Sequence, residues 1–291
     1  MLYLCNPIYL KMKPLISYYG GKQRLASKIV SYLPSHNIYV EPFCGGAAVL
    51  FAKGIPYTNR KCAYKEVIND TQELLINMYR QAILHKDEFE IMIQSTMYSQ
   101  SDHKRSRTIL KNPQEYNDLD KAWAYFVNIN TSFANKLFGG WGISRDPGSC
   151  PSQEWITHKQ RISAILNRIS AIHASCEDAL DCIKRWDSPN TLFYVDPPYI
   201  NTDCGHYKKY SIEDYKNLCN LLDTIEGKYV LSGYQQEIEP KSFHQKINFK
   251  ATMSAAGAGK TKLQKKIESK NERVEIIYVH DKDAKIFSLE N

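Results

Sequence analysis

The sequence predicts an α/β protein with a mostly parallel sheet, and three observations indicate this. Short apolar stretches with strand character recur along the chain, stretches with helical periodicity separate most of them, and a glycine turn directly follows the first strand. Alternating strands and helices are typical of a parallel sheet with both faces covered. The 291 residues are 43% hydrophobic and 24% charged, which excludes a disordered or fibrous chain.

The first unit of this sheet begins at Ile38. Residues 38–43 (IYVEPF) have strand character and run into Cys44-Gly45-Gly46, after which AAVLFAKG is helical and ends at Gly54. In a strand–turn–helix unit of this kind, glycines allow the backbone to approach a ligand at the helix N-terminus. The turn after the first strand is therefore a candidate ligand site.

The remaining strands are predicted from short apolar runs. A second strand around 63–68 ends at Asn69-Asp70 and leads into the helical stretch QELLINMYRQAILHK. Further elements are expected as strands at 170–174, 191–195, 228–232, 245–251 and 273–279, and as a helix at 212–225. The last two strands have no helix between them, so they are expected to form an antiparallel hairpin.

Residues 84–165 interrupt the alternation of strands and helices. They contain a basic cluster at 103–107 and an aromatic-rich run at 122–145. We interpret this stretch as a mainly helical insert, and the aromatic side chains of the run as part of its core. The expected organisation is a sheet domain from 1–83 and 166–291, with an inserted domain at 84–165.

The positive charge of the chain is concentrated in one segment. Lys and Arg number 38 and Asp and Glu 31, a net charge of +7, while the stretch from Lys241 to Lys270 alone holds eight lysines and one acid, Glu268. A basic segment of this kind attracts polyanions such as a phosphate backbone. The alternative is a solvated loop that keeps the protein in solution.

The cysteine pattern and the hydropathy of the chain argue against a metal site, a membrane span and a signal peptide. The eight cysteines form no CxxC pair and no HExxH motif accompanies them, so we expect reduced thiols and no metal site. No apolar run approaches the roughly 18 residues of a membrane span, and the N-terminus lacks the pattern of a signal peptide. The sequence thus predicts a soluble cytoplasmic protein without a membrane partner.

The sharpest short motif is Asp196-Pro197-Pro198-Tyr199, directly after the apolar strand at 191–195. In open α/β sheets, ligands bind at the carboxyl ends of the strands. Two prolines stiffen the turn and leave carbonyls that no local amide can pair with. A carboxylate, a carbonyl and an aromatic ring then face one point, an arrangement suited to the exocyclic amino group of a flat base. The alternative is a rigid turn without a ligand.

Several motifs combine with this one. They are SYYGGK at 17–22, EPFCGGAAVLF at 41–51, Asp70 at a strand end, SCEDAL at 175–180 and the DPPY motif itself. Their residues and their order resemble the Dam-type DNA adenine methyltransferases over nearly the whole chain. The resemblance implies a Rossmann-like fold, S-adenosylmethionine as methyl donor without a metal, and transfer to the N6 amino group of an adenine flipped out of duplex DNA.

The resemblance also assigns contacts to the methionine end of this cofactor. Tyr18 and Lys22 lie in the segment similar to the family's Gly-Gly-Lys motif. Main-chain groups around Phe43, Cys44 and Gly45 are expected to pass beneath the methionine moiety, where a glycine leaves room for close approach.

Three acids complete the assignment that the resemblance implies. Asp70 matches the acid that binds the ribose hydroxyls, although alone it could equally be the N-cap of the following helix. Asp178 matches the acceptor for the amino group of the cofactor adenine, with a capping or surface acid as the alternative. Asp196 is expected to contact both the cofactor and the target base.

The catalytic step implied by the resemblance is direct transfer. Asp196 and the carbonyl of Pro197 accept hydrogen bonds from the target amino group, and Tyr199 stacks on the flipped base. Pro198 completes the motif. Positioning supplies most of the acceleration.

Recognition of DNA is assigned to the insert. Its polar side chains include types that contact base edges in the major groove, and lysines of the basic segment are expected to contact phosphate. The predicted DNA contacts are Asn128, Asn130, Asn135, Lys136, Arg145, Lys260 and Lys262.

Several alternatives stay open at this point. The enzyme could be solitary or paired with a restriction endonuclease, of bacterial or phage origin, and an RNA adenine methyltransferase or an inactive nucleic-acid-binding relative would share the same motifs. A dehydrogenase is disfavoured because no GxGxxG follows the first strand. Nucleotide hydrolysis is disfavoured because Ser254 stands where a phosphate-binding loop before Gly259-Lys260 requires glycine.

Overall fold

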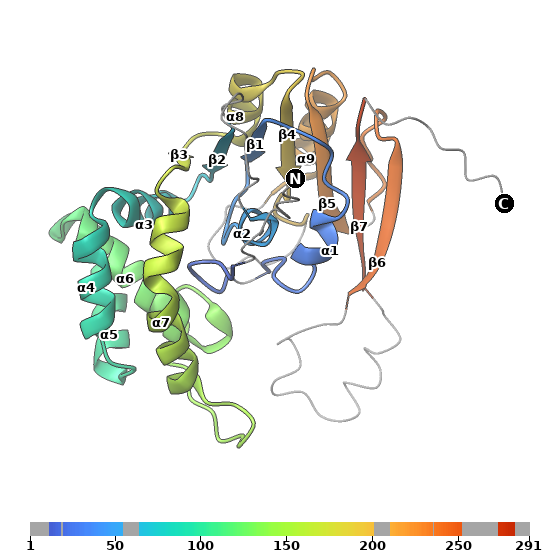
Figure 1. Ribbon diagram of the computed structural model, residues 1–291. Coiled ribbons are helices and arrows are strands. Elements are labelled where there is room, and N and C mark those ends of the chain that lie inside the picture. Colours follow the sequence, from blue (N-terminus) through green and yellow to red (C-terminus); the bar gives the residue numbers. More distant parts are fainter. Residues whose placement is uncertain are drawn as a thin grey trace, which may run out of the picture.

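The computed structural model describes residues 12–18, 20–54, 64–200, 210–234, 236–251 and 273–282. Within these residues the chain forms one seven-stranded sheet with the order β3-β2-β1-β4-β5-β7-β6 (Figure 1). The strands are β1 Ile38–Glu41, β2 Lys65–Asn69, β3 His173–Ser175, β4 Thr191–Val195, β5 Lys228–Tyr234, β6 Gln245–Ala251 and β7 Arg273–His280.

The predicted α/β class and the predicted strand directions are confirmed. Strands β3, β2, β1, β4 and β5 are parallel neighbours. Strand β7 is antiparallel to both β5 and β6, so it lies between them and forms the expected hairpin with β6. The segment 252–272 that connects this hairpin lies outside the described residues.

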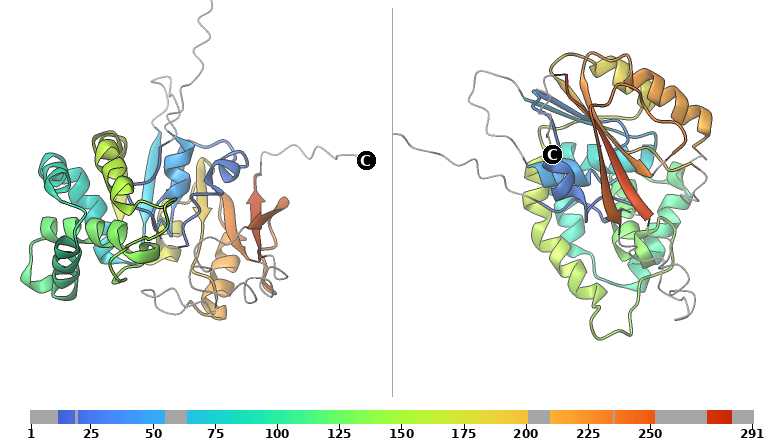
Figure 2. Two further views of the ribbon diagram at one scale, coloured as in Figure 1. Left: turned by 90° about the horizontal axis from the view of Figure 1, so that it is seen from below. Right: turned by 90° about the vertical axis from the view of Figure 1, so that its right-hand side faces the viewer.

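Helices cover both faces of the sheet. On one face, α1 Ala26–Val30 and α2 Ala48–Lys53 belong to the larger core cluster, and on the other, α8 Ala179–Trp186 and α9 Ile212–Leu222 belong to a second cluster. Figure 2 shows the blue helices and the orange helix on opposite sides of the strands. Because a strand's side chains alternate between faces, a central strand covered on both sides must be apolar throughout, which explains the run TLFYV of β4.

Helices dominate the chain between β2 and β3. After α3 Glu73–Leu84, this part contains α4 Lys86–Ser95, α5 Gln100–Lys111, α6 Asp118–Thr131 and α7 Pro151–Ile169, with short 3₁₀ turns at Pro113–Glu115 and Phe133–Asn135. These helices lie at the left of Figure 1, beside the β3 edge of the sheet. Helix α6 is at their centre, and its Phe126 packs against Phe89 and Trp155 at ring-centroid distances of 5.9 and 5.8 Å. The aromatic residues of α6 are thus core, as expected, whereas Phe133 after this helix is 53% exposed.

A cluster of three buried charges joins the helical part to the sheet domain. Glu66 of β2 pairs with Lys53 of α2, at 2.5 Å between Oε1 and Nζ, and with Arg168 of α7, at 2.6 Å between Oε2 and Nη1. A second nitrogen of Arg168 contacts Glu66 Oε1 at 2.9 Å. We call Lys53, Glu66 and Arg168 the junction cluster. It anchors the end of α7 to the sheet, where the chain returns from the helical part.

No helix in the described ranges is both long and apolar enough to span a membrane.

Candidate active site

Four predicted site residues follow neighbouring strands at the carboxyl ends of those strands. Asp178 follows β3, Asp70 follows β2, Gly45 follows β1 and Asp196 follows β4. Since the four strands are parallel and adjacent, their carboxyl ends lie side by side. The order of these residues across the sheet is therefore Asp178, Asp70, Gly45, Asp196, which is not their order in the sequence.

Asp70 connects the glycine turn after β1 with the start of α3. Its Oδ2 accepts a hydrogen bond from the amide of Gly45 at 3.1 Å, and its Oδ1 accepts one from the amide of Gln72 at 3.0 Å. The N-cap of α3 is Gln72 and not Asp70. The carboxylate is only 4% exposed, so it fixes the relative positions of two strand ends.

The glycine turn also packs against Tyr18. A Cβ atom on Gly45 would lie 3.1 Å from two ring carbons of Tyr18, and one on Gly46 would lie 2.9 Å from the Tyr18 Cβ. Gly45 has a positive φ of 46°, a conformation that glycine adopts without strain. The hydroxyl of Tyr18 donates to Oε1 of Gln72 at 3.2 Å. The glycines are thus needed here for the close approach of Tyr18.

Asn69 was not predicted as a site residue, yet it holds three strand ends together. Its side chain is fully buried. Its Nδ2 donates to the carbonyls of Pro42 and Glu177, both at 3.0 Å, while its Oδ1 accepts from the Ser175 hydroxyl at 2.9 Å and from the Glu177 amide at 3.0 Å. The available signal was a polar residue that ends an apolar strand directly before Asp70.

Two further predicted cofactor contacts, Asp178 and Phe43, have different surroundings. Asp178 is exposed and is the N-cap of α8, where its Oδ1 accepts from the amide of Leu180 at 2.8 Å. The capping role considered for Asp178 is thus present in the structure. Phe43 is half-buried, and its ring meets that of Tyr210 edge-on at 6.0 Å between centroids.

Asp196 carries the carboxylate of the DPPY motif and pairs with Lys22. The distance between Lys22 Nζ and Asp196 Oδ1 is 2.7 Å, and the side chains are 6% and 19% exposed. Lys22 also donates a hydrogen bond to the hydroxyl of Tyr199. The structure therefore places this ammonium at the DPPY motif, whereas the sequence indicated a contact with the methionine end of a cofactor.

Glu275 of β7 is a second buried carboxylate at this point, and sequence reasoning missed it. Its Oε1 lies 3.3 Å from Lys22 Nζ. The hydroxyl of Tyr199 donates to its two oxygens at 3.1 and 3.2 Å, and the hydroxyl of Ser232 donates to Oε1 at 2.9 Å. We call Lys22, Asp196 and Glu275 the site cluster.

Burial and mutual charge shift the titration of the site cluster. Burial alone would lower the pKa of Lys22, but the carboxylates of Asp196 and Glu275 outweigh it and raise that pKa above its usual value. Burial raises the pKa of both carboxyl groups above their usual values, and Lys22 opposes this only in part. The Asp196 carboxylate raises the pKa of Glu275 further. Lys22 therefore stays charged, and two carboxyl groups share one ammonium.

The aromatic ring of Tyr199 lies against that of Tyr234. The ring centroids are 4.3 Å apart and the planes differ by 31°. Lys22 Nζ lies 4.8 Å from the centroid of the Tyr199 ring. A base that stacks on Tyr199 must therefore use the face away from Tyr234 or displace Tyr234.

Two of the asparagines predicted to contact DNA are used inside the protein. Asn128 is fully buried, accepts from the amide of Phe138 at 2.8 Å and donates to the hydroxyl of Ser106 at 3.4 Å. Asn130 accepts from the amide of Ser17 at 3.3 Å. A base contact by Asn128 has no geometrical support here. The contact of Asn130 brings the end of α6 beside the segment that carries Lys22.

The other predicted DNA contacts lie in the segment after α6 or outside the described residues. Asn135 is half-buried with a positive φ of 53°, and Lys136 and Arg145 are exposed. Lys260 and Lys262 lie outside the described residues.

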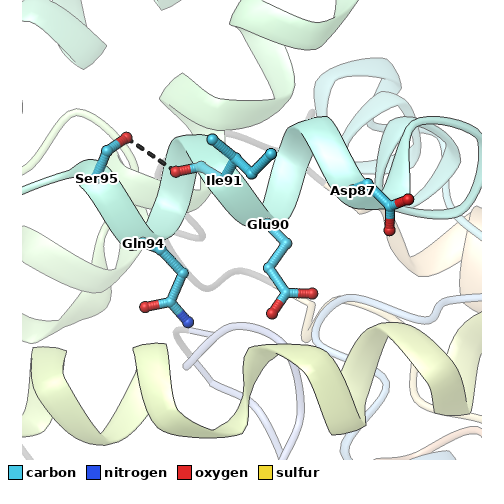
Figure 3. Close-up of a pocket in the computed structure, with 5 residues that line it drawn as sticks. All are labelled: Asp87, Glu90, Ile91, Gln94 and Ser95. Atoms are coloured by element: carbon cyan, nitrogen blue, oxygen red, sulfur yellow. Dashed lines mark hydrogen bonds between the residues drawn. The ribbon is translucent and has the colours of Figure 1, made fainter.

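A hollow on the helical part is lined by none of the predicted cofactor-binding, catalytic or DNA-binding residues. It lies along α4 and is lined by Asp87, Glu90, Ile91, Gln94 and Ser95 (Figure 3). Among the described residues, no three His, Cys, Asp or Glu side chains are grouped to hold a metal ion.

The fold and the site define the class of protein. A mostly parallel sheet with a glycine turn after β1, acids at adjacent strand ends and a DPPY motif after β4 is the architecture of a Rossmann-like methyltransferase. The chain belongs to the D12 class N6 adenine-specific DNA methyltransferase family, whose model matches residues 18–284. The expected enzyme class is thereby confirmed, and membership implies S-adenosylmethionine as methyl donor and DNA as substrate.

Relatives named as type II methyltransferases support this membership. The chain is 24% identical over 230 residues to the type II methyltransferase M.CviBI of Paramecium bursaria Chlorella virus NC1A, covering 76% of this chain and 82% of that protein. It is 26% identical to M.MjaIII of Methanocaldococcus jannaschii, over 70% and 76% of the two chains. It is 31% identical over 243 residues to M1.LlaDCHI of Lactococcus lactis subsp. cremoris, over 76% and 80%.

Proposed function

We propose that this site transfers the methyl group of S-adenosylmethionine to N6 of an adenine flipped out of duplex DNA, within a short sequence that the part of the chain at 84–165 recognises. The observation that carries the proposal is the order Asp178, Asp70, Gly45, Asp196 along the carboxyl edge of the sheet. Adjacent strands are about 4.8 Å apart, so these residues span three strand spacings, roughly 14 Å. An extended, multi-part ligand suits such a row.

The chemistry of the row fits the parts of the cofactor in sequence. Asp178 would meet the adenine, Asp70 the ribose hydroxyls, and the turn of Phe43 and Gly45 the methionine moiety. Asp70 is held in place by two amides, and a carboxylate is the acceptor that suits two hydroxyl donors. The bound cofactor supplies an activated methyl group on its sulfonium.

The residues of the DPPY motif would hold the target amino group. Asp196 is fixed through Oδ1 by Lys22, so its second oxygen, together with the carbonyl of Pro197, can accept the two amino hydrogens. Pro198 keeps the turn rigid, and Tyr199 provides the stacking surface. Holding the nitrogen lone pair in line with the methyl carbon is the main source of acceleration in such a transfer.

Lys22 is proposed to orient Asp196 as well as to lie near the methionine end. The 2.7 Å contact supports the first role. Tyr18, packed on the glycine turn, is proposed to border the cofactor at the same end. Both residues lie in the segment that Asn130 connects to α6, so cofactor contacts and the helical part are structurally linked.

DNA contact is proposed for half-buried and exposed side chains on the helical part and for the basic segment. Asn135, Lys136 and Arg145 are the candidates on the helical part, and Lys260 and Lys262 those in the basic segment. The described ends of β6 and β7 that flank this segment lie at the carboxyl end of β5, which supports a role of the segment near the site. A role in a cytoplasmic restriction–modification pair, with a cognate endonuclease, extends this proposal.

The test is methylation of an unmethylated bacterial genome by the purified chain with S-adenosylmethionine, read by single-molecule sequencing. We expect N6-methylated adenines within one short motif. Folded protein that binds the cofactor but modifies no adenine would overturn the proposal, and methylation of matched RNA in its place would assign an RNA substrate.

Replacing the lysines of 260–270 should weaken DNA binding and reduce its salt dependence. If the binding constant of this variant depends on salt concentration as steeply as that of the wild type, contact of these lysines with phosphate is excluded.

A further inference from the structure

The strand β7 contributes one carboxylate to the site from a position that no motif marks. Glu275 is 3% exposed and interrupts the otherwise apolar run VEIIYV. Burying a carboxylate costs free energy unless charged and polar partners compensate it. We propose that Glu275 is a positioning residue for methyl transfer, which fixes Lys22 and Tyr199 and gives the site cluster a second carboxyl group. This inference rests on the proposed function.

The backbone of Glu275 is held on both sides. It is paired with Tyr234 of β5 and with Phe249 of β6 in the ladders of the sheet. The hydroxyl of Ser232, which is fully buried, donates to its Oε1 at 2.9 Å. The carboxylate therefore has a fixed position, as a group that orients other side chains requires.

Glu275 acts on the motif through Tyr199. Both of its oxygens accept from the Tyr199 hydroxyl, at 3.1 and 3.2 Å. This hydroxyl also accepts from Lys22, so the tip of the ring is held from two sides. These contacts hold the tip of the ring, and the packing of Tyr234 at 4.3 Å between ring centroids limits its plane. Together they determine where a stacked base lies.

Glu275 also sets the charge beside Asp196. Lys22 contacts Asp196 at 2.7 Å and Glu275 at 3.3 Å. Without Glu275, one ammonium and one carboxylate would sum to zero, and Lys22 would neutralise the acceptor of the amino group. With Glu275, the ammonium is shared between two carboxyl groups, so Lys22 neutralises Asp196 less completely.

The second carboxyl group favours the transfer step. As N6 uses its lone pair to bond the methyl carbon of bound S-adenosylmethionine, the bond from that carbon to the sulfonium sulfur would break, and the sulfur would leave as a neutral thioether. N6 would change from neutral to positive and then pass one proton through the Asp196 carboxylate to solvent, which gives a neutral secondary amine. A preorganised negative group near a developing positive charge lowers the barrier because it needs no reorganisation during the reaction. Glu275 lies behind Asp196 and Tyr199, where it can act in this way without touching the base.

The experiment compares Glu275→Gln and Glu275→Asp with a matched control, Glu239→Gln. Glu239 likewise accepts from a tyrosine, Tyr278 at 2.7 Å, and pairs with Lys246 at 2.5 Å, but Tyr278 belongs to the core cluster on the opposite face of the sheet. Steady-state transfer to duplex DNA gives kcat and the KM values for DNA and cofactor. Thermal unfolding and cofactor binding are measured in parallel.

We expect Glu275→Gln to lower kcat on the order of 10²-fold while both KM values change less than about 3-fold. Glu275→Asp keeps the charge and should recover at least about 10-fold of that loss. Glu239→Gln should retain wild-type kcat. This split between kcat and KM, with rescue by the conservative variant, separates positioning from a packing role.

Two results would overturn the proposal. One is a Glu275→Gln kcat within about 2-fold of wild type, and the other is equal loss in both Glu275 variants accompanied by lower thermal stability. If Glu275→Gln does not fold, Ser232→Ala is the deciding variant, because it removes the hydrogen bond from the Ser232 hydroxyl to the Glu275 carboxylate. A lower kcat at unchanged KM supports the proposal, and an unchanged kcat excludes it. A wild-type chain without transfer activity would instead contradict the proposed function.

Discussion

The site cluster and the junction cluster each bury three charged side chains, but with opposite composition. The junction cluster surrounds one carboxylate with two cations, and all three residues are at most 7% exposed. The site cluster surrounds one ammonium with two carboxylates, and the side chain of Asp196 is 19% exposed. A closed, fully paired carboxylate joins parts of a fold, whereas a partly open carboxylate can still accept a hydrogen bond from a substrate.

Removing the open carboxylate should give the largest effect. We expect Asp196→Ala to reduce methyl transfer on the order of 10³-fold or more, while cofactor binding and the free energy of unfolding stay near wild type, because Lys22 keeps Glu275 as a partner. Radiolabelled methyl incorporation, calorimetric cofactor binding and denaturant unfolding measure the three quantities. Turnover close to wild type would remove Asp196 from the catalytic assignment.

Removing the closed carboxylate should instead affect stability. Glu66→Ala leaves Lys53 and Arg168 buried without their partner, and we expect the free energy of unfolding to fall by about 3–5 kcal/mol. The control is Glu177→Ala, which breaks the pair with the exposed Arg185 and should cost at most about 1 kcal/mol. Equal losses in the two variants, measured by urea unfolding, would show that the junction cluster contributes no more than a surface pair.

Glu41 lies where both clusters influence its charge. Burial raises its pKa to about 8, although the Tyr39 hydroxyl and the Leu50 amide oppose this, and Lys53 and Asp196 act on it with opposite sign. The unfolded carboxyl titrates near 4.5, so between these values the folded state binds more protons than the unfolded state. The free energy of unfolding should therefore fall by roughly 2–4 kcal/mol as pH rises from about 5 to 8.

The variant Glu41→Gln tests this pH dependence. Its amide oxygen can still accept from Tyr39 and Leu50 but does not titrate, so the decline in the free energy of unfolding between these pH values should flatten. Denaturant unfolding at three pH values measures the slopes, and parallel slopes for variant and wild type would assign the decline to other groups.

The smallest expected effects compare two predicted DNA contacts. Asn128→Ala should cost about 1–3 kcal/mol of stability, since it removes a buried side chain and leaves the Phe138 amide without its acceptor. Arg145→Ala should leave stability within about 0.5 kcal/mol and weaken DNA binding several-fold at low salt. Unfolding and DNA titrations on the same pair of variants separate the roles. Weaker binding by a fully stable Asn128→Ala would restore its prediction as a base contact.

The sequence was sufficient where one physical constraint dominates. The run TLFYV predicted β4 to its bounds because a strand buried on both faces must be apolar. The hairpin of β6 and β7 followed from the absence of an intervening helix. The position of β7 between β5 and β6 was not predicted, because strand pairing between distant segments leaves no local pattern.

The site was predictable where a motif occupies a strand end, and not where a partner comes from elsewhere. Asp70 and Asp196 are at the predicted edge, but Lys22 lies beside Asp196, and Asn69 and Glu275 were missed. Their roles depend on hydrogen bonds across the fold. Asn128 was misleading because α6 is buried along most of its length, so a polar residue in it faces the interior.

The position of Glu275 also has a consequence for synthesis of the chain. Glu275 is 76 residues beyond Tyr199 in the sequence, and its carboxylate accepts a hydrogen bond from the Tyr199 hydroxyl. At roughly 5–20 residues per second, the ribosome needs about 4–15 s to advance that far. During this interval β4 and its motif can already exist, while β7 has not yet paired with β5. The site cluster is therefore completed only when the antiparallel strand joins the sheet, so its full set of contacts depends on one of the last strands to be synthesised.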